Sequence, residues 1–396
     1  MRSVQRPSCR KPCGAEFELV SKRYQHDLPT FCVIATGGTI QAGAESPKEK
    51  FYYENGPAYG KTLFDQWASI TDYNILVYQP WNIGSHEIKM HHTITLAKIV
   101  LRCITNGADG ILVTHGTDTM VDTASIIQWL IGLHMKDIPI VFTGASNPSL
   151  AECSDGPENL DDALAVLANG GAKNRGVMIL MNRLIFLAEH AIKYDAGRIG
   201  GLGGPEYGSV LDGRVSFHYA PSVSGAHSIP LDKVVNSTQR AVLVMGYQGI
   251  DTQALEAVLD TKPEAVVAAG VGDGWFSEDA MAILQAAAAE GMIVIAAARS
   301  GRMARTTLEK WQIPCYDLDY SKCLALTRLA LWADYNHSDI RALLDGSGDE
   351  GTGKQGERDQ QSISPNALVM SLRQLVLQSC CRLMSWVYSP FSLECI

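Results

Sequence analysis

The chain has 396 residues, of which 46% are hydrophobic, so it can bury a large core and exceeds the usual size of a single domain. Its 33 basic and 42 acidic residues leave a net charge of −9, which argues against a nucleic-acid-binding surface because phosphate contacts need clustered lysine and arginine. No uncharged apolar stretch reaches roughly 18 residues, and the first 30 residues lack the apolar segment of a secretory signal. We therefore expect no membrane span and a cytoplasmic location.

The ten cysteines are scattered and fit neither a pair of CxxC type nor a compact disulfide framework. Cys9 and Cys13 form a CxxxC on a Pro-rich stretch, but a metal site would need a second pair of ligands. Cys32, Cys103 and Cys323 lie in apolar stretches, where we expect buried free thiols. We predict no metal ion and no other cofactor.

Apolar runs alternate with helical periodicity in the first half of the chain. The runs typical of buried strands are residues 31–35, 75–78, 110–114, 138–143 and 177–181. Helical periodicity lies between them at residues 94–104, 122–133 and 159–168. This βαβ repetition predicts a parallel sheet.

The middle of the chain interrupts this pattern, which then restarts. The Gly-rich residues 197–213 are expected to form a loop excursion, and residues 220–230 an interdomain connection. Beyond them, strands are expected at residues 241–245, 265–269 and 292–298, and helices at residues 252–259 and 278–290. A second, smaller α/β domain fits this repetition.

These boundaries divide the chain into five parts. They are an N-terminal extension (1–28), a larger N-terminal domain (29–219), an interdomain linker (220–235), a C-terminal domain (236–345) and a tail (346–396). The tail begins with a polar, Gly-rich segment (residues 346–362) typical of a flexible linker, and we assign it no function.

Two Gly- and Thr-rich segments directly follow predicted strands. ATGGTI covers residues 35–40, and THGTDT covers residues 114–119. Open α/β sheets bind ligands at the carboxyl ends of their strands, and Gly-rich turns let backbone N–H groups approach a ligand closely. Because threonine hydroxyls can donate, accept or attack, we expect acyl or amide chemistry in a crevice that the two turns share.

From about residue 29 to residue 344, the chain resembles the bacterial-type L-asparaginase and glutaminase-asparaginase family. Seven motifs occur in the order of that family: ATGGTI, NIGS (82–85), VTHGTDT (113–119), FTGA (142–145), DGPENL (155–160), NRGV (174–177) and AAGVGDG (268–274). The resemblance implies an α/β fold of two domains, a larger N-terminal one with a parallel sheet and a smaller C-terminal one. It also implies a homodimer or homotetramer in which a neighbouring chain completes each pocket.

The resemblance further implies which residues act. Thr39 matches the nucleophile that attacks a side-chain amide and forms an acyl-enzyme, Tyr52 matches the tyrosine that hydrogen-bonds this hydroxyl, and Thr117 and Asp118 match a second catalytic group. The implied substrate-binding residues are Gly38, Ser85, His86, Gly116, Thr117, Asp118 and Ala145. Ser85 would bind the α-carboxylate and Asp118 the α-amino group. The implied reaction hydrolyses L-asparagine, or a related small amide, to L-aspartate and ammonia.

Purely structural roles remain open for some of these residues. Thr36 and Thr39 could cap a turn, because threonine hydroxyls often satisfy loop N–H groups. Tyr52 could simply pack in a loop, and Asp118 could cap the helix that follows it. We expect a structural role for His115.

One catalytic position departs from the family. The family's lysine near the end of the helix after DGP activates the second threonine, and its place is taken here by Gly170, which has no side chain to accept a proton. Lys173, three residues further on, is an open alternative. Arg183, Asp273 and Trp275 also depart from the family pattern, so the pocket is expected to differ.

Gly170 keeps a second hypothesis open. The protein would then be a catalytically impaired relative that binds an amino acid, or one that acts on a different amide in a specialised pathway. A third hypothesis, a dinucleotide-dependent oxidoreductase, is disfavoured because no GxGxxG turn opens a helix with an acidic residue about 20 positions later.

Overall fold

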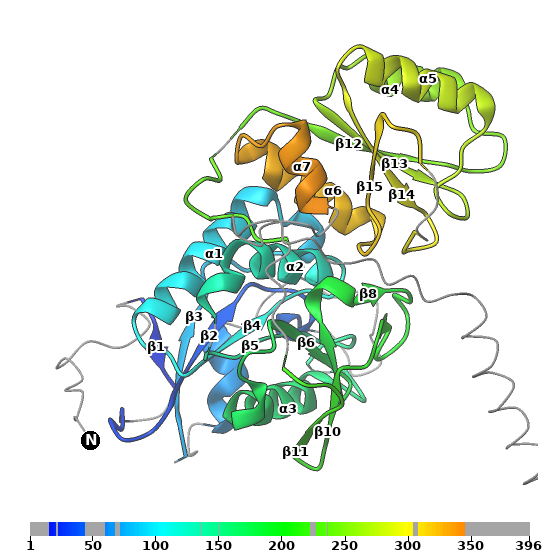
Figure 1. Ribbon diagram of the computed structural model, residues 1–396. Coiled ribbons are helices and arrows are strands. Elements are labelled where there is room, and N and C mark those ends of the chain that lie inside the picture. Colours follow the sequence, from blue (N-terminus) through cyan, green and yellow to red (C-terminus); the bar gives the residue numbers. More distant parts are fainter. Residues whose placement is uncertain are drawn as a thin grey trace, which may run out of the picture. The chain divides into compact units, whose positions relative to one another are not determined.

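A computed structural model describes residues 16–20, 23–43, 60–67, 72–135, 137–149, 151–221, 227–235, 237–303 and 308–344 (Figure 1). Tyr52, most of the predicted N-terminal extension and the predicted tail lie outside these ranges. Within the described residues, no helix combines the length and the apolar character that crossing a bilayer requires.

The N-terminal domain is built on a nine-stranded sheet, counted over the described residues, in the order β1-β3-β2-β4-β5-β6-β7-β10-β11. Its strands are β1 (Glu18–Leu19), β2 (Thr30–Ala35), β3 (Asn74–Tyr78), β4 (Gly110–Thr114), β5 (Ile140–Thr143), β6 (Val177–Met181), β7 (Leu184–Leu187), β10 (Gly208–Leu211) and β11 (Arg214–Phe217). The central strands β3, β2, β4, β5 and β6 run parallel, as predicted. The outer strands are antiparallel to their neighbours, so the sheet is mixed and not purely parallel.

Helices cover both faces of this sheet, as Figure 1 shows. They are α1 (Met90–Thr105), α2 (Met120–Ile131) and α3 (Gly156–Ala168). Along β2, Cys32 and Ile34 pack into the core that contains α1 and α2, while Phe31 and Val33 pack against α3. Since successive strand residues point to opposite faces, an unbroken apolar run is what a strand covered on both sides requires.

The Gly-rich residues 197–213 are not the plain loop that the sequence predicts. The short strands β8 (Ile192–Lys193) and β9 (Leu202–Gly203) pair antiparallel and form a hairpin, and β10 and β11 extend the large sheet. Strands β8, β9 and β10 have only two to four residues and include Gly203 and Gly208, so they show no clear apolar alternation. Backbone hydrogen bonds between the strands hold them together. Such bonds do not require a particular pattern of side chains, so the sequence does not predict these strands.

The C-terminal domain has a parallel four-stranded sheet in the order β12-β13-β14-β15, counted within the described part of the chain. Its elements are β12 (Ala241–Met245), α4 (Thr252–Leu259), β13 (Ala265–Gly270), α5 (Glu278–Ala289), β14 (Ile293–Ala298), β15 (Gln312–Pro314), α6 (Tyr320–Trp332) and α7 (His337–Leu344). The predicted strands and helices are confirmed, whereas β15, α6 and α7 were not predicted. Helices α4 and α5 pack on one face of the sheet, and α6 packs on the other and also against α2.

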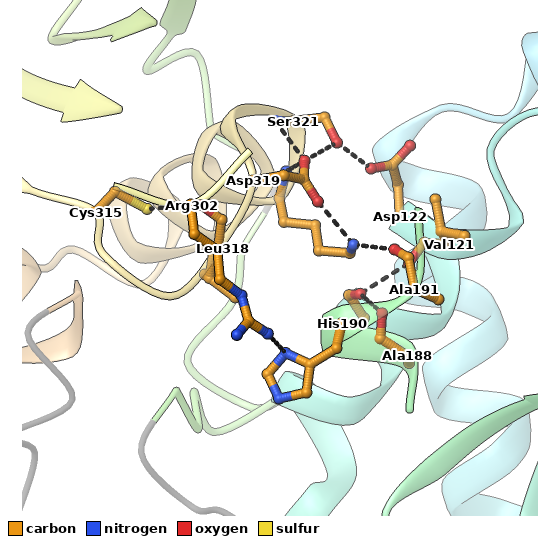
Figure 2. Close-up of polar contacts among 12 residues, drawn as sticks. Val121, Asp122, Ala188, His190, Ala191, Arg302, Cys315, Leu318, Asp319 and Ser321 are labelled. Carbon is orange, nitrogen blue, oxygen red and sulfur yellow. Dashed lines mark hydrogen bonds and ion pairs between the residues drawn. The ribbon is translucent and has the colours of Figure 1, made fainter. Parts of the chain in front are cut away.

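A buried polar cluster ties α6 to the N-terminal domain (Figure 2). The Lys322 side chain is fully buried, and its ammonium contacts Asp319 Oδ2 at 2.7 Å and the carbonyl of Ala191. The Ser321 hydroxyl, which has one proton to donate, lies 2.7 Å from a carboxylate oxygen of both Asp122 and Asp319. Burial raises the pKa of Asp122, whereas Lys322 outweighs the opposing effect of burial and lowers the pKa of Asp319.

The cysteine prediction is partly wrong. Cys103 and Cys323 are buried free thiols, as expected. Cys32 is also buried, but it is disulfide-bonded. An apolar environment does not distinguish a thiol from a half-cystine, because both are small and apolar.

Candidate active site

The two Gly- and Thr-rich turns touch each other. A Cβ placed on Gly38 would lie 2.3 Å from the Gly116 Cα atom, and Gly38 has a φ of +85°. Only glycine fits such an approach in this conformation. Thr39 follows directly, on the short 3-10 helix Thr39–Gln41, while Thr117 and Asp118 follow Gly116. The prediction that both turns converge on one crevice is confirmed.

Thr39, Thr117 and Asp118 line the same pocket, which encloses about 110 Å³. Its other walls are Ser146 and Asn147 after β5, Met181 at the end of β6, and the hairpin between β8 and β9. The space is below the roughly 300 Å³ that pockets for drug-sized ligands start from, so it suits a single small molecule.

Lys193, which was not predicted as a site residue, contacts two side chains of the second turn. Lys193 Nζ on β8 donates to Thr117 Oγ1 at 2.8 Å and to Asp118 Oδ1 at 2.6 Å. The Lys193 side chain is 17% exposed and lines the pocket. Gly170 lies in the 3-10 helix Gly170–Ala172, and Lys173 is exposed just after it. The amine that reaches Thr117 thus comes from β8 and not from either predicted position.

Ser85 and His86 lie close to the second turn in different ways. Ser85 is buried against Gly116, where its hydroxyl oxygen accepts from the Asp118 N–H at 3.2 Å and its carbonyl accepts from the Thr119 hydroxyl at 2.8 Å. The His86 side chain is exposed. Neither residue is part of the pocket wall, so their predicted substrate contacts stay predictions.

Asp155 explains why the DGPENL motif belongs to the site. Its carboxylate accepts hydrogen bonds from the backbone N–H groups of Ser146 and Asn147 at 2.9–3.0 Å and from Asn159 Nδ2 at 3.0 Å. This anchors the turn that follows Ala145, which is itself buried in the core on the α3 side. Asp155 thereby shapes the pocket wall from outside the pocket.

His115 has a structural setting, as expected. The ring is buried, Nδ1–H donates to the Gly116 carbonyl at 2.7 Å, and Nε2 has no hydrogen-bond partner among the described residues. Burial lowers the pKa of His115 to about 4, against a weaker opposing effect of the hydrogen bond to Gly116. The ring is therefore neutral at physiological pH.

The two-domain α/β fold, with a small polar pocket where two threonine-bearing turns meet, defines an asparaginase-like amidohydrolase. Residues 30–222 match the family model described as "Asparaginase, N-terminal", and residues 240–344 match the "Glutaminase/Asparaginase C-terminal domain". The chain belongs to the asparaginase family.

Individual relatives agree with this assignment. The chain is 30% identical to L-asparaginase 2 of Escherichia coli over 279 residues, which are 69% of this chain and 78% of that protein. It is 29% identical to the probable periplasmic L-asparaginase of Haemophilus influenzae, over 69% of this chain and 78% of that protein. The crystal structure of a probable cytoplasmic L-asparaginase from Campylobacter jejuni is similar, with a TM-score of 0.74, 28% identity and coverage of 80% of this chain and 99% of that one.

Proposed function

We propose that this protein hydrolyses L-asparagine to L-aspartate and ammonia through an acyl-enzyme on Thr39. The observation that carries the proposal is the meeting of Thr39 with Thr117 and Asp118 in one small pocket. The relatives named L-asparaginases support the substrate, and the family assignment supports the type of reaction.

In the first step, the Thr39 hydroxyl oxygen bonds to the carbon of the side-chain amide. The threonine proton goes to the amide nitrogen, the carbon–nitrogen bond breaks, and ammonia leaves an ester on Thr39. In the second step, water adds to the ester carbon, aspartate leaves, and Thr39 regains its proton. A threonine hydroxyl is a weak nucleophile at neutral pH, so it needs a proton acceptor nearby, a role in which the predicted contact with Tyr52 would assist.

The turns also suit the charges of the substrate and the transition state. The oxyanion that forms on the amide oxygen needs donors aimed at it, which N–H groups of the two Gly-rich turns can supply. Asp118 would hold the α-ammonium group, and the Ser85 hydroxyl, which still has its own proton to donate, would hold the α-carboxylate. Gly38, Gly116, His86 and Ala145 remain predicted contacts.

A non-catalytic binding protein is the main alternative, and its support is the glycine at position 170. The Lys193 side chain donates a hydrogen bond to Thr117. A glycine at position 170 is therefore not evidence that the protein has lost catalytic activity. We therefore retain the hydrolase.

Replacing Thr39 tests this function. We expect Thr39→Val, which keeps the branched shape and removes the hydroxyl, to lose roughly 10⁴-fold or more in kcat, and Thr39→Ser to keep more of it. Ammonia release from asparagine, glutamine and a panel of ω-amides measures this, with aspartate binding as the control for an intact pocket. A Thr39→Val variant that works as fast as wild type would disprove the nucleophile, and a wild type that binds aspartate but releases no ammonia would disprove the hydrolase.

We further propose a homodimer or homotetramer. In the described C-terminal domain, Tyr247 after β12 and Val271 and Trp275 after β13 leave large apolar surface exposed, with 46%, 36% and 58% of each residue accessible. Exposed apolar clusters of this kind are typical of interfaces.

The cytoplasmic location remains a proposal. The Campylobacter relative is named cytoplasmic and the Haemophilus relative periplasmic. The disulfide at Cys32 favours an oxidising compartment, since the cytosol keeps most thiols reduced. Cell fractionation, with the thiol content of the purified protein, decides between the two.

A further inference from the structure

We propose that this protein also hydrolyses amides whose nitrogen carries a carboxylate, and that Arg198 on the pocket wall binds that carboxylate. Such a substrate is an amino acid joined through its amino group to the side-chain carboxyl of aspartate. The inference rests on the proposed hydrolysis of asparagine and extends it to a larger leaving group, because the same acyl-enzyme would form on Thr39.

Arg198 provides a positive charge that asparagine does not need. Among the described residues, the cationic side chains of the pocket wall are those of Lys193 and Arg198. The Lys193 ammonium is bound to Thr117 and Asp118. The Arg198 guanidinium, in contrast, has no hydrogen bond or ion pair with any residue that the structure describes. Since Asp118 and Ser85 are assigned to the two charges of asparagine, Arg198 is left for a further anionic group on the substrate.

The pocket has a buried floor and an exposed rim. Thr39, Met181 and Leu202 line it and are all buried. Residues 195–198 of the hairpin between β8 and β9 line the same pocket and are exposed. Because the floor is closed by buried side chains, a substituent on the nitrogen of an amide that reacts at Thr39 has to extend towards the rim. Arg198 lies on this rim.

The loop that carries Arg198 has a compact backbone. Asp195 Oδ1 accepts a hydrogen bond from the Gly197 N–H at 2.9 Å, and the Arg198 carbonyl accepts one from the Gly201 N–H at 3.0 Å. A Cβ on Gly201 would lie 1.9 Å from the Asp195 carbonyl oxygen, so only glycine allows this turn. These contacts fix the backbone from which the Arg198 side chain starts, beside the pocket.

Arginine suits the recognition of a carboxylate. Its planar guanidinium stays charged at physiological pH and can donate two parallel hydrogen bonds to the two carboxylate oxygens. Because Arg198 is exposed, water and salt screen this attraction. We therefore expect Arg198 to set a preference among amides, while the bond cleavage itself takes place at Thr39.

The reaction balances in the same way as for asparagine. The Thr39 oxygen bonds to the amide carbon, the threonine proton goes to the amide nitrogen, and the carbon–nitrogen bond breaks. The leaving group is then a free amino acid in place of ammonia, and aspartate remains as an ester on Thr39. Water cleaves this ester, so that one water is consumed and the products are aspartate and the amino acid.

A matched pair of substrates tests the inference. β-Aspartylglycine carries the additional carboxylate, and β-aspartylglycinamide has a similar shape with a neutral amide in its place. We expect wild type to release aspartate from β-aspartylglycine with a kcat/KM about 10-fold higher, which is the lower end of the effect of a hydrogen bond to a charged group. Arg198→Met should remove most of this preference, and Arg198→Glu should reverse it.

Arg214→Met is the matched control, since Arg214 is exposed on β11 and does not line the pocket. This variant should keep the wild-type preference. A wild type without the preference, or a preference that persists in Arg198→Met, would overturn the inference. A wild type that hydrolyses asparagine but neither β-aspartyl compound would reject this inference alone, whereas a wild type that hydrolyses none of the three would reject the proposed function as well.

Discussion

The setting of His115, beside Gly116 of the second Gly- and Thr-rich turn, favours an uncharged ring. The ring is fully enclosed, and its one hydrogen bond within the described residues is donated to the Gly116 carbonyl. Protonation would add a buried N–H at Nε2 with no partner among these residues. The ring bonds to the carbonyl of Gly116, the residue that Gly38 approaches.

This setting predicts loss of stability in acid. The unfolded chain takes up a proton on His115 near pH 6.5, whereas the folded pKa is about 4, so the free energy of unfolding falls as the pH decreases between these values. The loss amounts to about 3 kcal/mol at most. In His115→Phe this contribution is absent, so the stability advantage of wild type should shrink from pH 7 to pH 4.5, measured by denaturant unfolding. An advantage that is equal at both pH values would contradict the prediction.

At the scale of elements, α6 connects the two domains through both apolar and polar contacts. Its apolar residues join the core that contains α2, and Asp319, at its N-terminus, accepts from the backbone N–H groups of Ser321 and Lys322. Lys322 then spans the interface to the Ala191 carbonyl. The first polar turn of α6 thus supports the strand that carries Lys193.

Removing Lys322 should therefore destabilise the fold. Lys322→Met leaves the buried carboxylate of Asp319 without its counter-charge, which we expect to cost roughly 3–5 kcal/mol in thermal or denaturant unfolding. The double variant Lys322→Met with Asp319→Asn removes both charges and should recover much of this loss. If the double variant is as unstable as Lys322→Met alone, lost packing and not the unpaired charge is the cause.

At the scale of the whole molecule, the proposed assembly depends on the carboxyl ends of β12 and β13. Trp275 is bonded through its backbone to Val271, at 2.9 Å in both directions, which holds the indole on an ordered turn. A large aromatic side chain on a rigid turn is the kind of residue that dominates interfaces.

We expect wild type to be a dimer or larger at micromolar concentration, and Trp275→Ser to weaken the association by at least about 30-fold. Light scattering across a dilution series measures both. Leu211→Ser is the matched control, since Leu211 is 58% exposed on β10, in the other domain. A wild type that stays monomeric, or equal effects of the two substitutions, would rule out this surface.

The sequence by itself determined the central strands, the helices between them and the meeting of the two turns. Each depends on local patterns: apolar runs for β2 and β4, and Gly-Thr motifs at their carboxyl ends, which parallel pairing brings to one edge of the sheet. The two turns could therefore be located in advance, and the family resemblance singled out Thr39, Thr117 and Asp118 on them. Tyr52 lies outside the described residues and stays a prediction.

Only the tertiary structure identifies Lys193 as the lysine that contacts Thr117. Lys193 sits on a strand of two residues in a region predicted to lead into a loop, and nothing in the residues around it points to Thr117, which precedes it by more than seventy positions. The hydrogen bond from Lys322 to the Ala191 carbonyl likewise joins residues far apart in the sequence and could not be predicted from it. Such contacts depend on the packing of elements distant in sequence, because a hydrogen bond is defined by a distance and a direction that only the folded chain specifies.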